Sequence, residues 1–362
     1  MNRTDALTIL LAVSGALCLG LTALVAGRKG ARDRRERQGA ERRRRYAATL
    51  VRGGPGHLQA IAHEAAAGGA AQVDLAIAAS LVRDGLGPER RDAVARAAQA
   101  AGLVDALLRG LRSRRAVDRG RAALLITRPG LAPAAAESVA PLVRDPDPDV
   151  RLTAIGGLAE IGTAGAAHAL IGALAAGDTA PERIVERLGA PWAAGTVIAE
   201  LARDGPGPVR RAHAGRQVPV RASLAAALGL AGDPAAEPVL LGLLAAGGEE
   251  ERVSAARALG TAGAAAAMPA LIGALEDGEW PVRAQAAKSL GRLGAVGAVP
   301  ALERCLADRA WWVRANAASA LRVLGVPGRA ALTRALASPD PFARDRAREQ
   351  LELDAVAQGA TP

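Results

Sequence analysis

A sequence pattern with a period of 31 residues constrains this chain more than any other feature. Over residues 280–308 the apolar and small positions include Val282, Ala286 and Leu290, and the same frame returns one period later and one period earlier. Prolines and leucines repeat at the same spacing in the second half of each unit, at 238, 269 and 300 and at 240, 271 and 302. Self-similarity at a period of about 20 to 50 residues is typical of proteins built from stacked repeats.

Each unit has the pattern of a helical hairpin. The apolar positions from Val282 to Leu293 fall on one stripe of a helix, and residues 294–297, with two glycines, interrupt it. Pro300 suits the first turn of a second helix, because the missing N–H has no partner there in any case. One hairpin cannot bury both sides of its apolar stripe, so the units are expected to stack.

The repeated motif resembles the HEAT-like repeats, in the short bacterial form named after phycobilin lyases, whose unit reads roughly V-R-x-x-A-A-x-x-L-G-x-x-G. The resemblance is strongest from Val220 to Leu336 and looser upstream, where Val150, Arg151, Ala154 and Leu158 fit best. It implies an all-α fold, a right-handed α-solenoid that usually serves as a protein-binding scaffold. It also implies a ladder between adjacent units, formed by arginines at 151, 221, 252, 283, 314 and 344 with Asp277, Asp308 and Asp340.

The repeat frame predicts a solenoid over residues 47–354. Nine hairpins are expected, beginning near residues 56, 88, 117, 149, 182, 220, 251, 282 and 313, and Pro341 to Asp354 is expected to form a capping helix. Residues 355–362 are predicted to be a disordered tail. Residues 205–217 exceed the repeat period and are rich in glycine and proline, which indicates a loop at one edge of the stack.

An uncharged stretch at residues 6–27 predicts one transmembrane helix, because about 20 apolar residues cross a bilayer. Residues 28–46 form a basic juxtamembrane segment, with ten basic and three acidic residues up to Arg45. Positive flanks stay in the cytoplasm. We therefore expect a single-pass protein of the cell membrane with its N-terminus outside and its solenoid in the cytoplasm. Ala12, Ala16 and Gly20 form a small-residue stripe through which two spans could associate.

The basic segment has two interpretations. It can act as a topology determinant alone, or its arginines can also contact anionic lipid headgroups, with Arg42, Arg43, Arg44 and Arg45 as the candidates. The whole chain has a formal charge of +10, and this segment supplies most of it. The solenoid itself is only weakly basic, so no nucleic-acid partner is expected.

The residues typical of catalytic and metal sites do not cluster in the sequence. The four histidines have no helical spacing that would make a metal site, the two cysteines have no metal-ligand spacing, and Cys305 occupies a core position of the repeat. No cofactor, no metal and no enzymatic activity are expected. The alternative is a helical-repeat enzyme of the chromophore-lyase or DNA-glycosylase type, as some HEAT-like proteins are.

Tryptophan supplies the main candidate binding site in a chain with only 2% aromatic residues. Trp280 and Trp311 are one period apart, Trp312 follows, and Phe342 matches it one unit later. Tryptophan is enriched at binding hot spots, whereas the competing interpretation is that the rings fill gaps between alanine-rich helices. Arg210, Arg211 and Arg216 in the predicted loop are further candidates, unless that loop is only solvated.

The sequence therefore predicts a non-catalytic, membrane-anchored scaffold or adaptor that binds a protein partner, possibly a membrane-embedded enzyme. A second alternative is a regulator that responds to anionic lipids through the arginine-rich segment.

Overall fold

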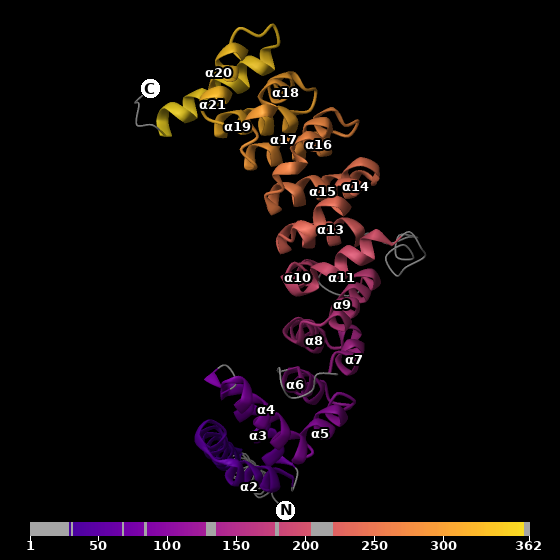
Figure 1. Cartoon of the computed structure of the whole chain (residues 1–362), viewed down its shortest axis with the longest axis vertical. Helices are drawn as coiled ribbons and strands as arrows, with labels where there is room; N and C mark the ends of the chain where they lie inside the picture. The colour runs from indigo at the N-terminus through magenta and orange to yellow at the C-terminus, as the bar shows by residue number, and fades with distance from the viewer. Residues whose placement is uncertain are drawn as a thin grey trace, which may run out of the picture. The chain divides into compact units, whose positions relative to one another are not determined.

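Helices make up all the regular secondary structure of the residues that the computed structural model describes, which are 29, 32–66, 69–82, 85–127, 135–177, 181–203 and 220–357. The chain divides into two units, Met1–Pro133 and Ala134–Pro362, and each is described by itself (Figure 1). The predicted span at 6–27 lies outside the described residues. Within the described ranges, no helix is long and apolar enough to cross a membrane.

The first unit is a helical bundle with its own core. Residues 32–52 form one helix. It is followed by α2 (Pro55–Ala66), α3 (Ala70–Val82), α4 (Pro88–Ala100), α5 (Leu103–Gly110) and α6 (Ala116–Ile126). Tyr46 and Leu50 are fully buried and pack with Leu58 and Ile61 of α2. The predicted boundary between a juxtamembrane segment and the solenoid at residue 46 therefore falls inside one helix, which carries the arginines and continues into the core.

The second unit consists of stacked hairpins followed by a final helix. Its first half contains α7 (Ala135–Val139) with the 3₁₀ segment η2 (Ala140–Arg144), α8 (Pro148–Ile161), α9 (Ala164–Ala176), α10 (Pro181–Leu188) and α11 (Pro191–Ala202). Its second half contains α13 (Val220–Ala231), η3 (Pro234–Ala236), α14 (Glu237–Ala246), α15 (Glu249–Ala262), η4 (Ala265–Ala267), α16 (Met268–Gly273), η5 (Ala274–Glu276), α17 (Trp280–Arg292), η6 (Val296–Ala298), α18 (Val299–Arg304), η7 (Cys305–Ala307), α19 (Trp311–Val323), α20 (Val326–Ala335) and α21 (Pro341–Ala357).

The first helix of every predicted hairpin begins within two residues of its expected position. The third hairpin is divided, because α6 belongs to the first unit and α7 to the second. The capping helix α21 reaches Ala357, three residues beyond the predicted end of the solenoid. The remainder of the predicted tail lies outside the described residues.

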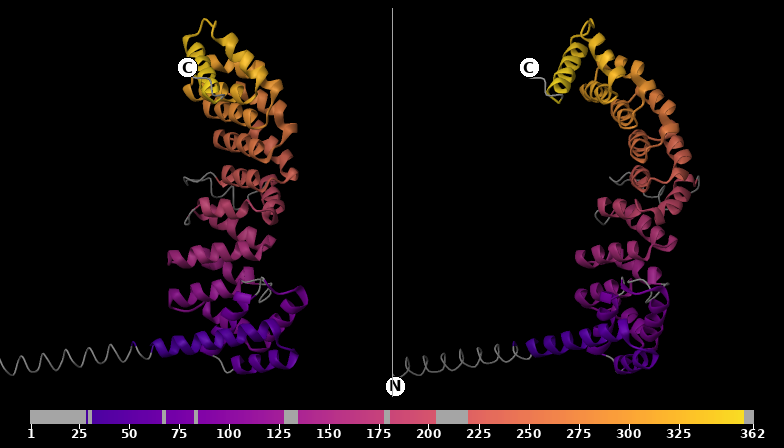
Figure 2. Two further views of the ribbon diagram at one scale, coloured as in Figure 1. Left: turned by 90° about the vertical axis from the view of Figure 1, so that its left-hand side faces the viewer. Right: turned by 60° about the vertical axis from the view of Figure 1, so that its left-hand side comes forward.

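The hairpins of residues 220–335 stack in two layers. The first helices α13, α15, α17 and α19 pack side by side, and α14, α16, α18 and α20 line the other layer (Figure 1). Figure 2 shows these layers from two further sides. Val282, Leu290 and Leu321 are completely buried, as the helical stripe predicts.

Glycine permits the closest contacts between successive first helices. A Cβ atom added to Gly260 would lie 2.5 Å from the Ser289 side chain, and one added to Gly291 would lie 2.8 Å from the Cβ of Ala320. No real Cβ could occupy either position without a shift of the neighbouring helix. The repeated glycine thus sets how closely α15, α17 and α19 approach one another.

Candidate functional site

Two steps of the ladder that the resemblance implied are present as arginine–aspartate ion pairs. Arg221 pairs with Glu251 instead, at 3.2 Å, and Arg151 Nε has no hydrogen-bond partner among the described residues. Arg252 Nε lies 2.8 Å from Asp277 Oδ2, and Arg283 Nε lies 2.8 Å from Asp308 Oδ2 in the next unit. Arg283 also donates through Nη1 to the backbone carbonyl of Asp277, at 2.8 Å. Each arginine therefore ties the turn before its own helix to the turn of the following unit.

The ladder carboxylates remain charged because several donors surround each of them. Burial acts to raise the pKa of Asp308, but the hydrogen bond from Arg283, the backbone N–H of Ala310 and nearby positive charge outweigh it, so its pKa lies below the usual value. Asp277 shows the same lowered pKa, with Arg252 and the N–H of Glu279 as its donors. These pairs stabilise the stack most when both partners are ionised.

The ladder changes at its last step. Arg344 Nη1 donates to the carbonyl of Ser338 at 2.8 Å, as Arg314 Nη1 does to the carbonyl of Asp308, so Ser338 occupies the ladder position. The expectation that Asp340 belongs to the ladder is therefore wrong. Its Oδ1 accepts from the backbone N–H of Ala343 at 2.9 Å, in the first turn of α21.

Arg314 consequently has no carboxylate across this step. It is buried, with 7% of its surface exposed, and its Nε has no hydrogen-bond partner among the described residues. The guanidinium lies 4.5 Å from the centre of the Phe342 ring. A cation–π contact thus takes the place that an ion pair has one unit earlier.

Four aromatic residues at the starts of α17, α19 and α21 form what we call the aromatic surface: Trp280, Trp311, Trp312 and Phe342. Their exposed fractions are 45%, 47%, 56% and 56% respectively. The rings of Trp311 and Trp312 meet edge to face, with centroids 4.6 Å apart, and Arg346 lies over the ring of Trp311. The rings are therefore not core residues, and binding of a partner through them stays a prediction. The candidates Arg210, Arg211 and Arg216 lie outside the described residues.

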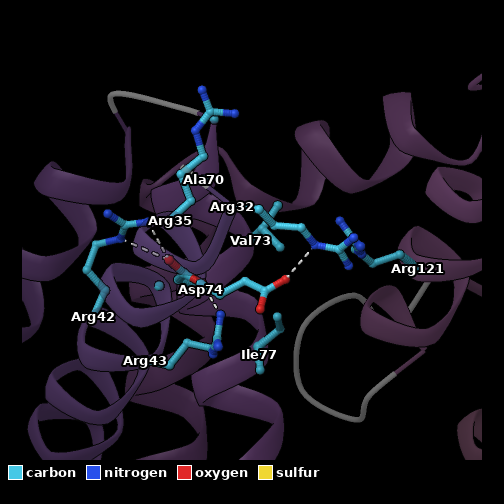
Figure 3. A pocket seen from close by; sticks show the side chains of 12 residues that line it. Arg32, Arg35, Arg42, Arg43, Ala70, Val73, Asp74, Ile77 and Arg121 are labelled. Carbon is cyan, nitrogen blue, oxygen red and sulfur yellow. Dashed lines mark hydrogen bonds and ion pairs between the residues drawn. The ribbon is translucent and has the colours of Figure 1, made fainter. Parts of the chain in front are cut away.

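The first unit contains a second candidate site that the sequence did not predict, a pocket of about 710 Å³ that we call the arginine pocket. At its floor the carboxylate of Asp74, on α3, accepts from Arg42 Nε at 2.9 Å and from Arg43 Nη1 at 2.7 Å (Figure 3). Arg121 of α6 lies on the opposite side of the pocket from Arg42. The pocket is lined by Arg32, Arg35, Glu36, Gly39, Arg42, Arg43, Gly69, Ala70, Val73, Asp74, Ile77 and Arg121.

Three of the four arginines predicted to contact lipid headgroups are paired within the fold. Arg42 and Arg43 bind Asp74, Arg45 pairs with Glu64, and Arg44 is exposed. The sequence signal for this arrangement was Asp74 itself, the one charged residue in the apolar helix from Ala70 to Val82. A lone carboxylate on such a helix indicates a buried cationic partner.

Cys305 is a buried core residue, as its repeat position predicted. Burial and the neighbouring Asp308 raise the pKa of its thiol to about 11. The thiol is therefore protonated at neutral pH and lacks the thiolate character of a nucleophile.

Comparison with known proteins agrees with the stacked hairpins. The family of HEAT repeats matches residues 243–322 and 271–352, a region that extends from α14 into α21. No curated protein sequence matches the chain. These observations define the matched region as HEAT repeats, in a chain whose described residues have only helical regular structure.

Solved structures similar to the chain share little sequence with it. An engineered protein is 18% identical, with 86% of this chain and 98% of that chain covered and a TM-score of 0.34. Importin β is 16% identical, with 86% and 47% covered and a TM-score of 0.42, so the chain spans about half of its length. Human deoxyhypusine hydroxylase in complex with glycerol is 22% identical, with 69% and 95% covered and a TM-score of 0.29. At these levels of similarity no function can be transferred.

Proposed function

We propose that the protein is a non-catalytic, membrane-anchored scaffold that binds a protein partner through the aromatic surface. The observation that carries the proposal is the exposure of Trp280, Trp311 and Trp312, each about half exposed in a chain that has four tryptophans. Clustered exposed aromatic side chains mark interaction sites on soluble surfaces. The rings also lie at the starts of α17 and α19, the first helices of two consecutive hairpins, so an extended partner segment could contact both hairpins at once.

Two arginine side chains pack against the rings of the aromatic surface, and one of them, Arg346, is also paired with Glu349 at 2.6 Å. Arg346 lies 5.7 Å from the centre of the Trp311 ring, and Arg314 lies beneath Phe342. Tryptophan and arginine side chains are enriched among the hot-spot residues of protein interfaces.

The proposed anchor rests on the uncharged residues 6–27 and the basic flank that follows them. It places the N-terminus outside and the solenoid in the cytoplasm, near a partner that could itself be a membrane-embedded enzyme. Protease added to intact cells should then leave the chain beyond residue 46 uncut, and digestion there would overturn the topology.

The binding proposal is tested by the double substitution Trp280→Ala and Trp311→Ala. Photocrosslinking from position 312 in intact membranes identifies the bound protein, and titration of that purified partner measures its affinity. We expect the double variant to weaken binding by about thirtyfold or more, which corresponds to about 2 kcal/mol, because truncation at a hot spot acts on the complex. The melting temperature should change little, since both rings are half exposed.

A matched control removes exposed apolar side chains from other helices of the second unit, Ala134–Pro362. Leu152 is 44% exposed on α8 and Leu230 is 57% exposed on α13. Replacement of both by Ala should leave the partner's affinity unchanged. Equal losses of affinity in the two double variants, or unchanged affinity in the tryptophan variant, would contradict the proposal.

A further inference from the structure

The arginine pocket combines a strong positive charge with an apolar wall. Five arginines line it against two acidic residues, Glu36 and Asp74, a formal excess of three positive charges. Ala70, Val73 and Ile77 of α3 form the apolar wall. Its volume of about 710 Å³ lies within the range of about 300 to 1,000 Å³ that is usual for small-molecule sites.

The floor of the pocket is fixed rather than adaptable. Asp74 is 4% exposed and holds two partly exposed guanidinium groups, so the cluster of three side chains retains one positive charge. A Cβ atom on Gly39 would lie 3.0 Å from Arg43 Nη1 and 3.4 Å from Asp74 Oδ1. Glycine inside a helix is unfavourable relative to alanine, and here it leaves the space that the cluster needs.

Three arginines lie at the rim of the pocket, and they differ in whether they have an ion-pair partner. Arg32 pairs with Glu36 at 3.0 Å. Arg35 and Arg121 are exposed, and neither has an ion-pair partner among the residues that the structure describes. Arg121 comes from α6 and Arg35 from the helix at 32–52, so two separate elements supply the rim.

We propose that the arginine pocket binds the phosphate group of an organic phosphate, whose carbon body lies against Val73 and Ile77. A phosphomonoester carries nearly two negative charges at neutral pH and three acceptor oxygens, which suits an excess of three positive charges better than a single carboxylate does. Guanidinium groups bind phosphate through paired hydrogen bonds. The phosphate can belong to a soluble phosphomonoester or to a phospholipid headgroup.

Calorimetric titration of the detergent-solubilised full chain distinguishes the two sources. Glycerol 3-phosphate represents the soluble phosphomonoester, short-chain phosphatidic acid below its micelle concentration represents the headgroup with its acyl chains, and short-chain phosphatidylcholine and succinate are the comparison ligands. We expect saturable binding of at least one phosphomonoester. Binding of phosphatidic acid alone assigns the site to lipid, whereas equal binding of glycerol 3-phosphate assigns it to the phosphate group itself.

Two matched double variants test the location of the site. Replacement of Arg35 and Arg121 by Gln should weaken binding about tenfold or more, since charge-assisted hydrogen bonds are lost. Replacement of Arg34 and Arg112, which are exposed but outside the pocket, by Gln removes the same charge and should have little effect. Circular dichroism melts verify that both variants fold. No saturable binding of any phosphate, succinate binding as tight as phosphate binding, or equal losses in both variants would overturn the proposal.

Discussion

Arg283 and Arg314 occupy the same position in two consecutive hairpins but meet different partners. Between α17 and α19, Arg283 is held by Asp308, whereas between α19 and α21 the matching position is Ser338 and Arg314 lies under the Phe342 ring. The backbone contacts are the same at both steps, since each arginine donates through Nη1 to the two carbonyls before its helix. The steps differ in the side chain at the ladder position, Asp308 at one and Ser338 at the other.

This difference shows how a repetitive stack acquires a distinct surface at its end. Loss of the carboxylate at 338 leaves a buried cation, and an aromatic ring compensates through a contact of about 0.5 to 2 kcal/mol. Phe342 is itself 56% exposed, and it lies on α21, the helix whose Arg346 lies over the Trp311 ring. The aromatic surface thus adjoins the step at which the ladder is interrupted.

The largest expected effect is on the core that both steps share. Leu290 of α17 and Leu321 of α19 are completely buried and one period apart. Replacement of either by Ala should lower the free energy of unfolding by about 2 to 5 kcal/mol, as urea denaturation measures, because each leaves a cavity. Val323, which is 59% exposed, provides the control and should change stability little when replaced by Ala. A loss below about 0.5 kcal/mol at Leu290 would mean that the repeat frame is shifted.

The next largest effect distinguishes the stability contributed by the ladder step at Asp308 from that contributed by the step at Ser338. Asp308→Ala removes the partner of a largely buried guanidinium and should cost about 1 to 3 kcal/mol of folding free energy. Ser338→Ala, at the matching position, breaks no ion pair and should cost less than about 0.5 kcal/mol. Thermal or urea melts of the two variants measure the contrast directly. Equal losses would show that the ladder pair adds nothing that the serine lacks.

Acid should weaken the complete steps of the ladder. The pKa values of Asp277 and Asp308 are lowered in the folded chain, so their stabilisation is fully present above the ordinary value of about 4 and is lost as the pH falls through the folded values. The loss should be smaller than in Asp308→Ala, since a protonated carboxyl still accepts hydrogen bonds. Unfolding free energies measured from pH 6 down to pH 3 should decline less steeply when both residues are replaced by Asn. An unchanged slope would contradict this account.

The smallest expected effect restores the missing partner. Ser338→Asp places a carboxylate at the interrupted step and should stabilise the chain by about 0.5 to 1 kcal/mol through Arg314. The gain should disappear in the background of Arg314→Gln, which thermal melts of the four combinations would reveal. A gain that survives the loss of Arg314 would assign it to the cap of α21 instead.

Most of the fold could be predicted because its determinants are local. The apolar period, the glycine breaks and prolines such as Pro300 mark each hairpin within one unit of sequence. The continuity of the helix across residue 46 was not predicted, because the arginine-rich composition of residues 28–45 hid Tyr46 and Leu50, which are spaced four apart on one helical face.

The candidate sites were harder to predict because they depend on side chains that meet only after folding. The exposure of Trp280 and Trp311 depends on how adjacent hairpins pack, which the 31-residue spacing of the two residues does not reveal. The arginine pocket joins Arg42, Asp74 and Arg121 from three segments far apart in the sequence. None of these three residues lies at a strongly repeated position of the 31-residue pattern. The pattern therefore gave no indication that they come together.

The glycine contacts between α15, α17 and α19 have a mechanical consequence. Gly291 already lies against Ala320, and Gly260 against Ser289, with no space for one further carbon atom. Because these atoms are already in van der Waals contact, the three helices cannot move closer together at the glycine contacts, but they can still move apart there. The stack should therefore be stiff when a force bends it so that the helices close at the glycine contacts. It should be more compliant when the force bends it in the opposite direction.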